Sequence, residues 1–174
     1  MALGYSTPAE ISIILAEAKW RPPANGLRAA IEFAPEKASY THGEFMAVRF
    51  HVQNVGQQDI EFRSASTRQD WAQVKDKDGD DVKVHRRRHS GTVYTRSHTI
   101  KPTDVFSLKT TGLGFAEEDQ TLDEFHAHKG YYVGSILHSK PGTYAVHYDV
   151  NRDLKTGIRK VLIEGVRDFF LARC

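Results

Sequence analysis

The sequence has almost no cysteine: Cys174, the last of 174 residues, is the only one. A single thiol excludes an intramolecular disulfide, so cysteine pairing says nothing about the redox compartment. Cys174 could serve as a nucleophile only if the chain end were held beside a base. The Asn-x-Ser/Thr acceptor of N-glycosylation is also missing.

Long apolar runs are absent as well. No stretch approaches the roughly 18 to 20 apolar residues that a membrane-spanning helix needs. The N-terminus lacks the basic and apolar regions of an intact signal peptide, so an exported form would begin after its cleavage site. A net charge of +2, with 40% hydrophobic and 26% charged residues, is typical of one ordinary globular domain and does not by itself indicate a polyanionic partner.

Sequence signatures of enzymes are missing too. The chain contains no Gly-x-Ser-x-Gly elbow, no His-Glu-x-x-His and no phosphate-binding Gly-x-x-x-x-Gly-Lys. Gly112-Leu113-Gly114 lacks the third glycine of a dinucleotide-binding fingerprint. We therefore expect a protein that is not an enzyme.

What the sequence does contain is the two-residue periodicity of half-buried strands. In 27–33 and 46–52, large apolar residues alternate with small, polar or charged ones. Further strands are predicted at 60–62, 72–74, 82–84, 93–100, 105–108, 131–137, 144–150 and 159–164. Because so many short strands with one buried face require a second sheet, the predicted fold is all-β, an antiparallel β-sandwich.

We predict helical structure only near the ends of the chain. Residues 7–19 carry an N-cap, a first-turn proline and an apolar stripe, which predicts a short N-terminal helix. We expect residues 1–25 to be this helix with a Pro-rich connection, and 26–174 to be the sandwich. The last 17 residues fit either a strand or a helix, and we favour the strand.

The acidic run from Asp76 to Asp81 predicts a hairpin turn. Asp78-Gly79 lies between alternating segments, and these residue types tolerate a positive φ. A calcium loop of the EF-hand type does not fit, because from Asp76 the glycine falls at position 4 and Arg87 stands at position 12.

Several short motifs resemble an Ig-like domain of uncharacterised planctomycete proteins. They are Trp20, Asn25-Gly26-Leu27, Gly43-Glu44, Asn54-Val55-Gly56, Asp78-Gly79, Lys101-Pro102, Pro141-Gly142-Thr143-Tyr144 and Thr156-Gly157. The resemblance spans most of 20–164 and implies an Ig-like sandwich from an extracytoplasmic bacterial protein, alone or attached to BlaR-like peptidase relatives. A weaker similarity exists to BsuPI-type proteinase inhibitor domains. Neither carries over catalytic residues.

The segment 82–101 is the one sizeable stretch of a single charge sign. It has six Lys and Arg residues and no acid. Such a patch attracts phosphates, anionic lipids or acidic proteins, although an acidic stretch in 117–124 could simply pair with it. We expect a protein partner rather than nucleic acid. The candidate binding residues are Arg86, Arg87, Arg88, Tyr94 and Arg96.

Histidine is abundant, with nine copies. In an extended segment, His126 and His128 would lie on one face and could chelate Cu or Zn if a third ligand converged. Candidates for that ligand are His85, His89, His98 and His138. The alternative is that these histidines are exposed loop residues without a metal.

The functional prediction is a non-catalytic Ig-like binding module of an extracytoplasmic bacterial protein, with loops displayed on a rigid scaffold. The stretch 110–130 is the expected binding loop, because loops longer than roughly 12 to 15 residues are often functional. The alternatives are a metal-binding protein that uses His126 and His128, and a proteinase inhibitor that presents an exposed loop.

Overall fold

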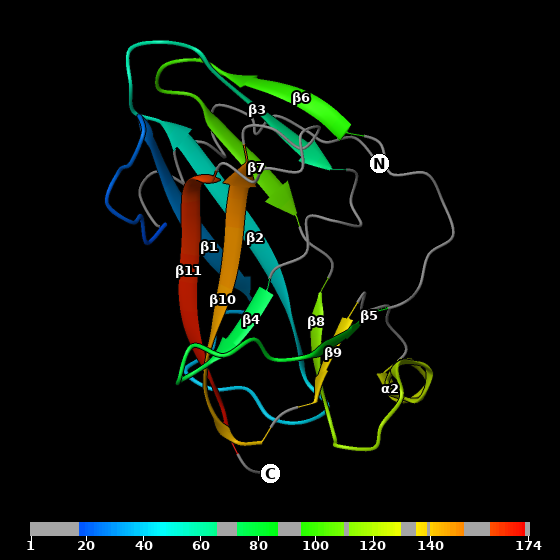
Figure 1. Cartoon of the computed structure of the whole chain (residues 1–174). Helices are drawn as coiled ribbons and strands as arrows, with labels where there is room; N and C mark the ends of the chain where they lie inside the picture. Colours follow the sequence, from blue (N-terminus) through cyan, green and yellow to red (C-terminus); the bar gives the residue numbers. More distant parts are fainter. Residues whose placement is uncertain are drawn as a thin grey trace.

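The computed structural model describes residues 18–65, 73–86, 95–109, 112–129, 135–138, 140–151 and 161–172. Apart from one helix, the regular elements in these ranges are strands (Figure 1). They are β1 (Leu27–Ala34), β2 (Phe45–Asn54), β3 (Ile60–Ala65), β4 (Gln73–Asp76), β5 (Val84–Arg86), β6 (Thr95–Ile100), β7 (Val105–Lys109), β8 (Leu113–Ala116), α2 (Leu122–Lys129), β9 (Ser135–His138), β10 (Gly142–Asn151) and β11 (Val161–Leu171).

The strands form the two sheets of an Ig-like β-sandwich. The first sheet has the order β1-β2-β8-β9-β5, with β7 also paired to β2, and the second has the order β11-β10-β3-β6, with β4 also paired to β10. The predicted all-β sandwich is therefore confirmed. Its pairs are antiparallel except for β8 and β9, which run parallel. The chain crosses from β8 to β9 by way of α2, as a parallel neighbour requires.

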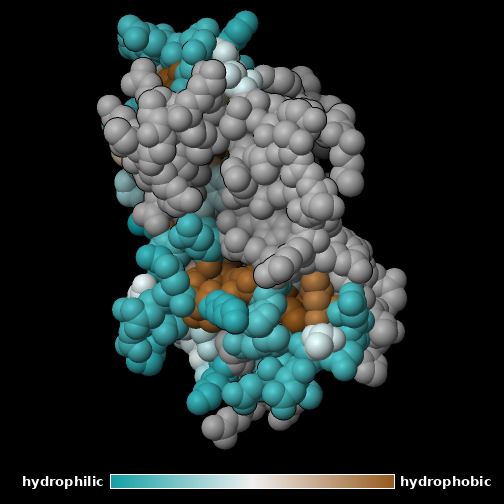
Figure 2. Space-filling view, turned by 45° about the vertical axis from the view of Figure 1, so that its right-hand side comes forward, coloured by the Kyte–Doolittle hydropathy of each residue, from teal (hydrophilic) through white to brown (hydrophobic). Residues whose placement is uncertain are grey.

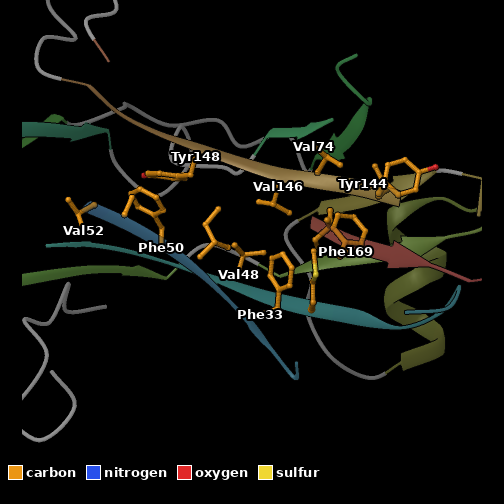
Figure 3. Close-up of a cluster of buried hydrophobic side chains, with 14 of the residues drawn as sticks. Phe33, Val48, Phe50, Val52, Val74, Tyr144, Val146, Tyr148 and Phe169 are labelled. Carbon is orange, nitrogen blue, oxygen red and sulfur yellow. The ribbon is translucent and has the colours of Figure 1, made fainter. Parts of the chain in front are cut away.

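The core lies between the sheets, where the two-residue period turns one face of each strand inward. Figure 3 shows side chains of β1 and β2 pointing toward those of β4, β10 and β11. Phe50 and Tyr148 meet across the core with ring centroids 4.2 Å apart. The labelled residues of this buried cluster are Phe33, Val48, Phe50, Val52, Val74, Tyr144, Val146, Tyr148 and Phe169.

Two long strands each pair with two shorter ones along their length. On β2, residues 45–46 pair with β8 and residues 49–53 pair with β7. On β10, residues 144–147 pair with β4, and Asn151 pairs with β3. The sandwich therefore divides into an end with β3, β6 and β7 and an end with β4, β5, β8, β9 and α2 (Figure 1).

One seam of the sandwich is closed by contacts between β1 and β11. Arg167 of β11 donates from Nη1 to the carbonyl oxygen of Ile31 at 2.9 Å, and its guanidinium lies 4.7 Å from the centroid of the Phe33 ring. The backbone of Tyr40 bonds to the edge of β11: its N–H donates to the Phe170 carbonyl and its carbonyl accepts from the Ala172 N–H, both at 2.8 Å. At this seam, Arg167 therefore covers the backbone of β1 at Ile31, and Tyr40 covers the edge of β11 at Phe170 and Ala172.

The turn predicted at Asp78-Gly79 is present. The Gly79 N–H donates to the carbonyl of Asp76, and only Gly79, at φ 87°, has a positive φ in this turn. The Asp76 carboxylate accepts from the N–H groups of Asp78 and Asp80, both at 3.0 Å. The carboxylate of Asp76 thus stabilises the turn itself, as Asx turns do. The Val82 N–H donates back to the Val74 carbonyl of β4, and the chain then enters β5 in the other sheet.

The stretch 110–130 is not the long loop that we expected. It contains β8, whose residues are all buried, and the helix α2. Thr121 caps this helix: its N–H donates to the Glu124 carboxylate at 2.7 Å, and its hydroxyl accepts from the Glu124 N–H at 3.3 Å. This is a capping box, and it was visible in the sequence as Thr121-x-x-Glu124.

The helix α2 is held against β8 by a close approach at Gly114. A Cβ at this position would lie 2.6 Å from ring atoms of Phe125, which is 1% exposed. Phe125 shares a small buried cluster with Ala116 and Ile136. Gly114 is therefore a packing glycine rather than part of a nucleotide-binding loop.

For the last 17 residues, the structure decides between the strand and the helix that the sequence allowed. The strand β11 occupies most of the last 17 residues, so the strand is confirmed and the helix is excluded there. The helix predicted over 7–19 lies outside the described residues except for positions 18 and 19, which are not helical. In the part of the chain that is described, none of the helices has the length and apolar character that crossing a bilayer requires.

Candidate functional site

The predicted basic site is divided between the two sheets. Arg86 ends β5, opposite Ser135 of β9, and Arg96 is the second residue of β6, opposite Ser64 of β3. The strands β5 and β6 belong to different sheets and do not pair with each other. Arg87, Arg88 and Tyr94 lie outside the described residues.

The two basic strand ends occupy comparable positions in the fold. Within the described residues, β5 is the last strand of the first sheet and β6 is the last strand of the second. Both lie on the side of the molecule away from the β1–β11 seam (Figure 1). Figure 2 turns this side forward and shows apolar side chains reaching the surface between hydrophilic ones.

The predicted pairing of His126 and His128 on an extended segment is wrong. Both residues belong to α2. Successive helical residues turn by about 100°, so positions two apart lie about 200° apart around the axis. The backbone thus directs these two positions to different sides of the helix, so the extended geometry on which the predicted pair depended is absent.

A different pair of histidines is brought together. His85 of β5 and His138 of β9 have ring centroids 4.4 Å apart, with an angle of 54° between the ring planes. His85 lies opposite Ile136 in the register, so His138 is the diagonal neighbour on the same face of the sheet. From the sequence, His85 and His138 were candidates only for the third ligand beside His126 and His128.

The imidazole of His138 is oriented by the chain that leads into α2. Its Nε2 lies 2.7 Å from the carbonyl oxygen of Gln120, and this position is fixed by a turn in which the Gln120 N–H donates to Glu117. A carbonyl only accepts, so Nε2 carries the proton. In the neutral ring the lone pair then lies on Nδ1.

The surroundings of His85 favour its neutral form. Burial lowers the pKa of His85, and the neighbouring His138 and Lys83 lower it further. The side chains of His85 and His138 are both half-buried. A neutral His85 ring can therefore lie in contact with His138 without charge repulsion.

A third histidine belongs to a buried network on the outer face of the first sheet. His51 of β2, which is 2% exposed, has Nδ1 2.8 Å from the Ser107 hydroxyl and Nε2 3.2 Å from the Glu32 carboxylate. Because a carboxylate only accepts, Nε2 donates to Glu32 and Nδ1 accepts from Ser107. Burial lowers the pKa of His51, despite the opposing effect of Glu32.

This Ser107–His51–Glu32 array orders a hydroxyl, an imidazole and a carboxylate across β7, β2 and β1. Such an order occurs in nucleophilic catalysis. Here the imidazole is enclosed, and a reacting group cannot reach it in this conformation. We interpret the array as a hydrogen-bonded network that stabilises three adjacent strands.

The remaining sequence candidates are placed as follows. His98 of β6 lies in the other sheet from the His85–His138 pair and packs among aromatic rings, with ring centroids 5.1 Å from Phe62 and 4.7 Å from Phe106. His89 is outside the described residues. Among the side chains that are described, no three His, Cys, Asp or Glu residues lie together as a ready metal site.

Comparisons with known proteins add little. No family model matches the chain, and no curated protein is similar to it. A CARDB domain from Pyrococcus furiosus, solved in complex with di-metal ions, is 11% identical, with 84% of this chain and 87% of that chain covered and a TM-score of 0.38. An ASH or PapD-like domain of human CEP192 is 15% identical, with coverages of 99% and 94% and a TM-score of 0.28. Similarities at this level support no conclusion about this chain, whose sandwich fold follows from its own strand order.

Proposed function

We propose that this protein is a non-catalytic interaction module whose partner is an acidic protein segment. The observation that carries the proposal is the placement of Arg86 and Arg96 on the terminal strands of opposite sheets. The basic segment 82–101 passes from one edge to the other. Positive charge is thereby associated with both sheet edges on one side of the sandwich.

A sheet edge can bind an extended partner through its backbone. Terminal strands have N–H and C=O groups on one side that no neighbouring strand of the sheet takes, and added strands bind to such groups. The edge strand β6 has six residues, with exposed Ser97 and Thr99. Strand addition gives affinity, and complementary charge gives partner choice.

In the described part of the chain, the terminal strands at the opposite seam, β1 and β11, already carry contacts. There, Arg167 is engaged with Ile31 and Glu36, and Tyr40 bonds to the backbone of β11. A partner strand would have to displace these contacts. The side with β5 and β6 is therefore the favoured docking edge.

The location of the protein is part of the same proposal. An extracytoplasmic bacterial module is what the resemblance over 20–164 implies, and a rigid sandwich that exposes its edges suits this role. A protein partner fits better than nucleic acid because the whole chain has a net charge of only +2.

The proposal is tested with labelled peptides of about eight residues that alternate Glu with Val, a typical strand length and pattern. We expect a saturable rise in fluorescence anisotropy, and binding that weakens at high salt. The Arg86→Glu/Arg96→Glu variant should bind at least about tenfold more weakly, a loss of about 1.4 kcal/mol in binding free energy. Lys19→Glu, beside Glu36 on the closed seam, is the matched control for each of the single variants Arg86→Glu and Arg96→Glu, because every one of them reverses one positive charge.

Two results would contradict the proposal. One is equal binding of the Glu-Val peptide by the wild type and the double variant. The other is binding of single-stranded DNA at least as tightly as the peptide, with the same dependence on Arg86 and Arg96, which would assign the edge to nucleic acid instead.

A further inference from the structure

The contact between His85 and His138 leads to an inference that is independent of the proposed partner. The two rings come from neighbouring strands of one sheet and are held on the same face. Their centroids are 4.4 Å apart. Two imidazoles on one tetrahedral metal, with metal–nitrogen distances of about 2.0–2.1 Å, have ring centres about 5 Å apart. The two centroid separations thus differ by less than about 1 Å.

The hydrogen bond from His138 to Gln120 is of the kind that orients a histidine for binding a metal. Histidines that bind metals usually donate their other ring N–H to a carboxylate or a backbone carbonyl, which fixes the tautomer and the ring orientation. His138 donates Nε2–H to the Gln120 carbonyl at 2.7 Å. Its Nδ1 is therefore the nitrogen with the free electron pair, and the turn at 117–120 holds the ring in place.

The position in the fold also suits a metal site. His85 lies on the edge strand β5, and both imidazoles are half-buried, so an ion can enter from solvent. The acidic residues Glu117, Glu118 and Asp119 are exposed in the turn that positions Gln120. Their negative charge raises the local concentration of cations.

We propose that His85 and His138 form a transition-metal site for Zn²⁺, Ni²⁺ or Cu²⁺, with Nδ1 of His138 as one ligand and water in the remaining positions. Imidazole nitrogen suits these ions and not Mg²⁺ or Ca²⁺, which prefer oxygen. The site differs from the one predicted at His126 and His128, because its ligands come from two paired strands rather than from one helix.

The test is calorimetric titration of the chelator-treated full chain with Zn²⁺ and Ni²⁺, with Mg²⁺ as the negative control. We expect one site whose affinity falls at least about tenfold in His85→Gln and in His138→Gln, equivalent to about 1.4 kcal/mol. His147→Gln, on β10 of the other sheet, is the matched control and keeps the wild-type affinity. Circular dichroism and thermal unfolding verify that each variant is folded.

A measurement on the unmodified protein keeps the proposal testable if a variant does not fold. Substoichiometric Ni²⁺ or Cu²⁺ should broaden the NMR signals of residues around 85 and 138 first. Unchanged affinity in both glutamine variants would overturn the proposal. So would broadening centred on α2 with affinity lost only in His126→Ala/His128→Ala, since the ligands would then be the helical histidines.

Discussion

The side chain of Asn54 on the first sheet bonds to the backbone of Ile100 on the second. Its Nδ2 lies 2.8 Å from the carbonyl oxygen of Ile100 and 2.8 Å from that of Gln58, and its Oδ1 accepts from the N–H of Gly56 at 2.9 Å. Asn54 is fully buried. One amide thus satisfies three backbone groups where β2, β3 and β6 end or begin.

We predict that Asn54→Ala lowers the free energy of unfolding by about 1–3 kcal/mol, because it removes the side-chain donor to the buried carbonyl of Ile100. Denaturant unfolding measures the change. Gln58→Ala is the control: only the backbone carbonyl of Gln58 is used, so its unfolding free energy should stay within about 0.5 kcal/mol of the wild type. Equal stability of Asn54→Ala and wild type would contradict the structural role of this amide.

We predict that Gly114→Ala costs about 1–3 kcal/mol by forcing Phe125 out of its place, since the added Cβ would lie 2.6 Å from the ring. Thermal unfolding tests this. Gly142→Ala, whose nearest contact would be 3.9 Å, should be tolerated. Combining Gly114→Ala with Phe125→Leu should cost less than the sum of the single changes, because they share one contact. Strict additivity would count against direct contact.

We predict that the protein loses stability in mild acid because the pKa of His51 is lowered in the folded state. Its folded-state pKa lies below 6.5, with burial as the main cause and with Glu32, Arg49 and Ser107 facing the ring. The unfolded chain therefore binds the proton first, so the contribution of His51 is complete above pH 6.5 and declines as the pH falls from 6.5 toward the folded pKa. Unfolding free energies across this window should fall less steeply in His51→Gln.

The same group can be titrated directly. An NMR titration of the His51 ring protons should give a midpoint below 6.5. A midpoint at or above this value would show that the Glu32 carboxylate outweighs burial, and the acid sensitivity assigned to His51 would then be wrong.

Arg167 should contribute to stability through geometry as well as charge. We predict that Arg167→Lys lowers the unfolding free energy by about 1–2 kcal/mol, because lysine cannot both reach the Ile31 carbonyl and lay a planar group over Phe33. Lys19→Ala removes the other, exposed partner of Glu36 and should change stability by less than about 0.5 kcal/mol. A larger effect at Lys19 than at Arg167 would reverse this assignment.

Much of the fold could be predicted from sequence because its signals are local. Alternation in 27–33 and 46–52 identified the buried faces of β1 and β2, and Asp78-Gly79 identified a turn. The Thr121-x-x-Glu124 capping box was equally local, yet the region was interpreted as a loop and His126 and His128 as extended. That error came from a missed signal rather than from missing information.

The sequence by itself determined which face of each strand is buried, because side chains alternate across a strand whatever its neighbours are. Only the tertiary structure decided which strands pair: β5 joins β9, and β6 joins β3, although a single segment links β5 to β6. Pairing depends on contacts between distant parts of the chain. For this reason the proximity of His85 and His138, and the placement of Arg86 and Arg96 on separate edges, are properties of the folded sandwich.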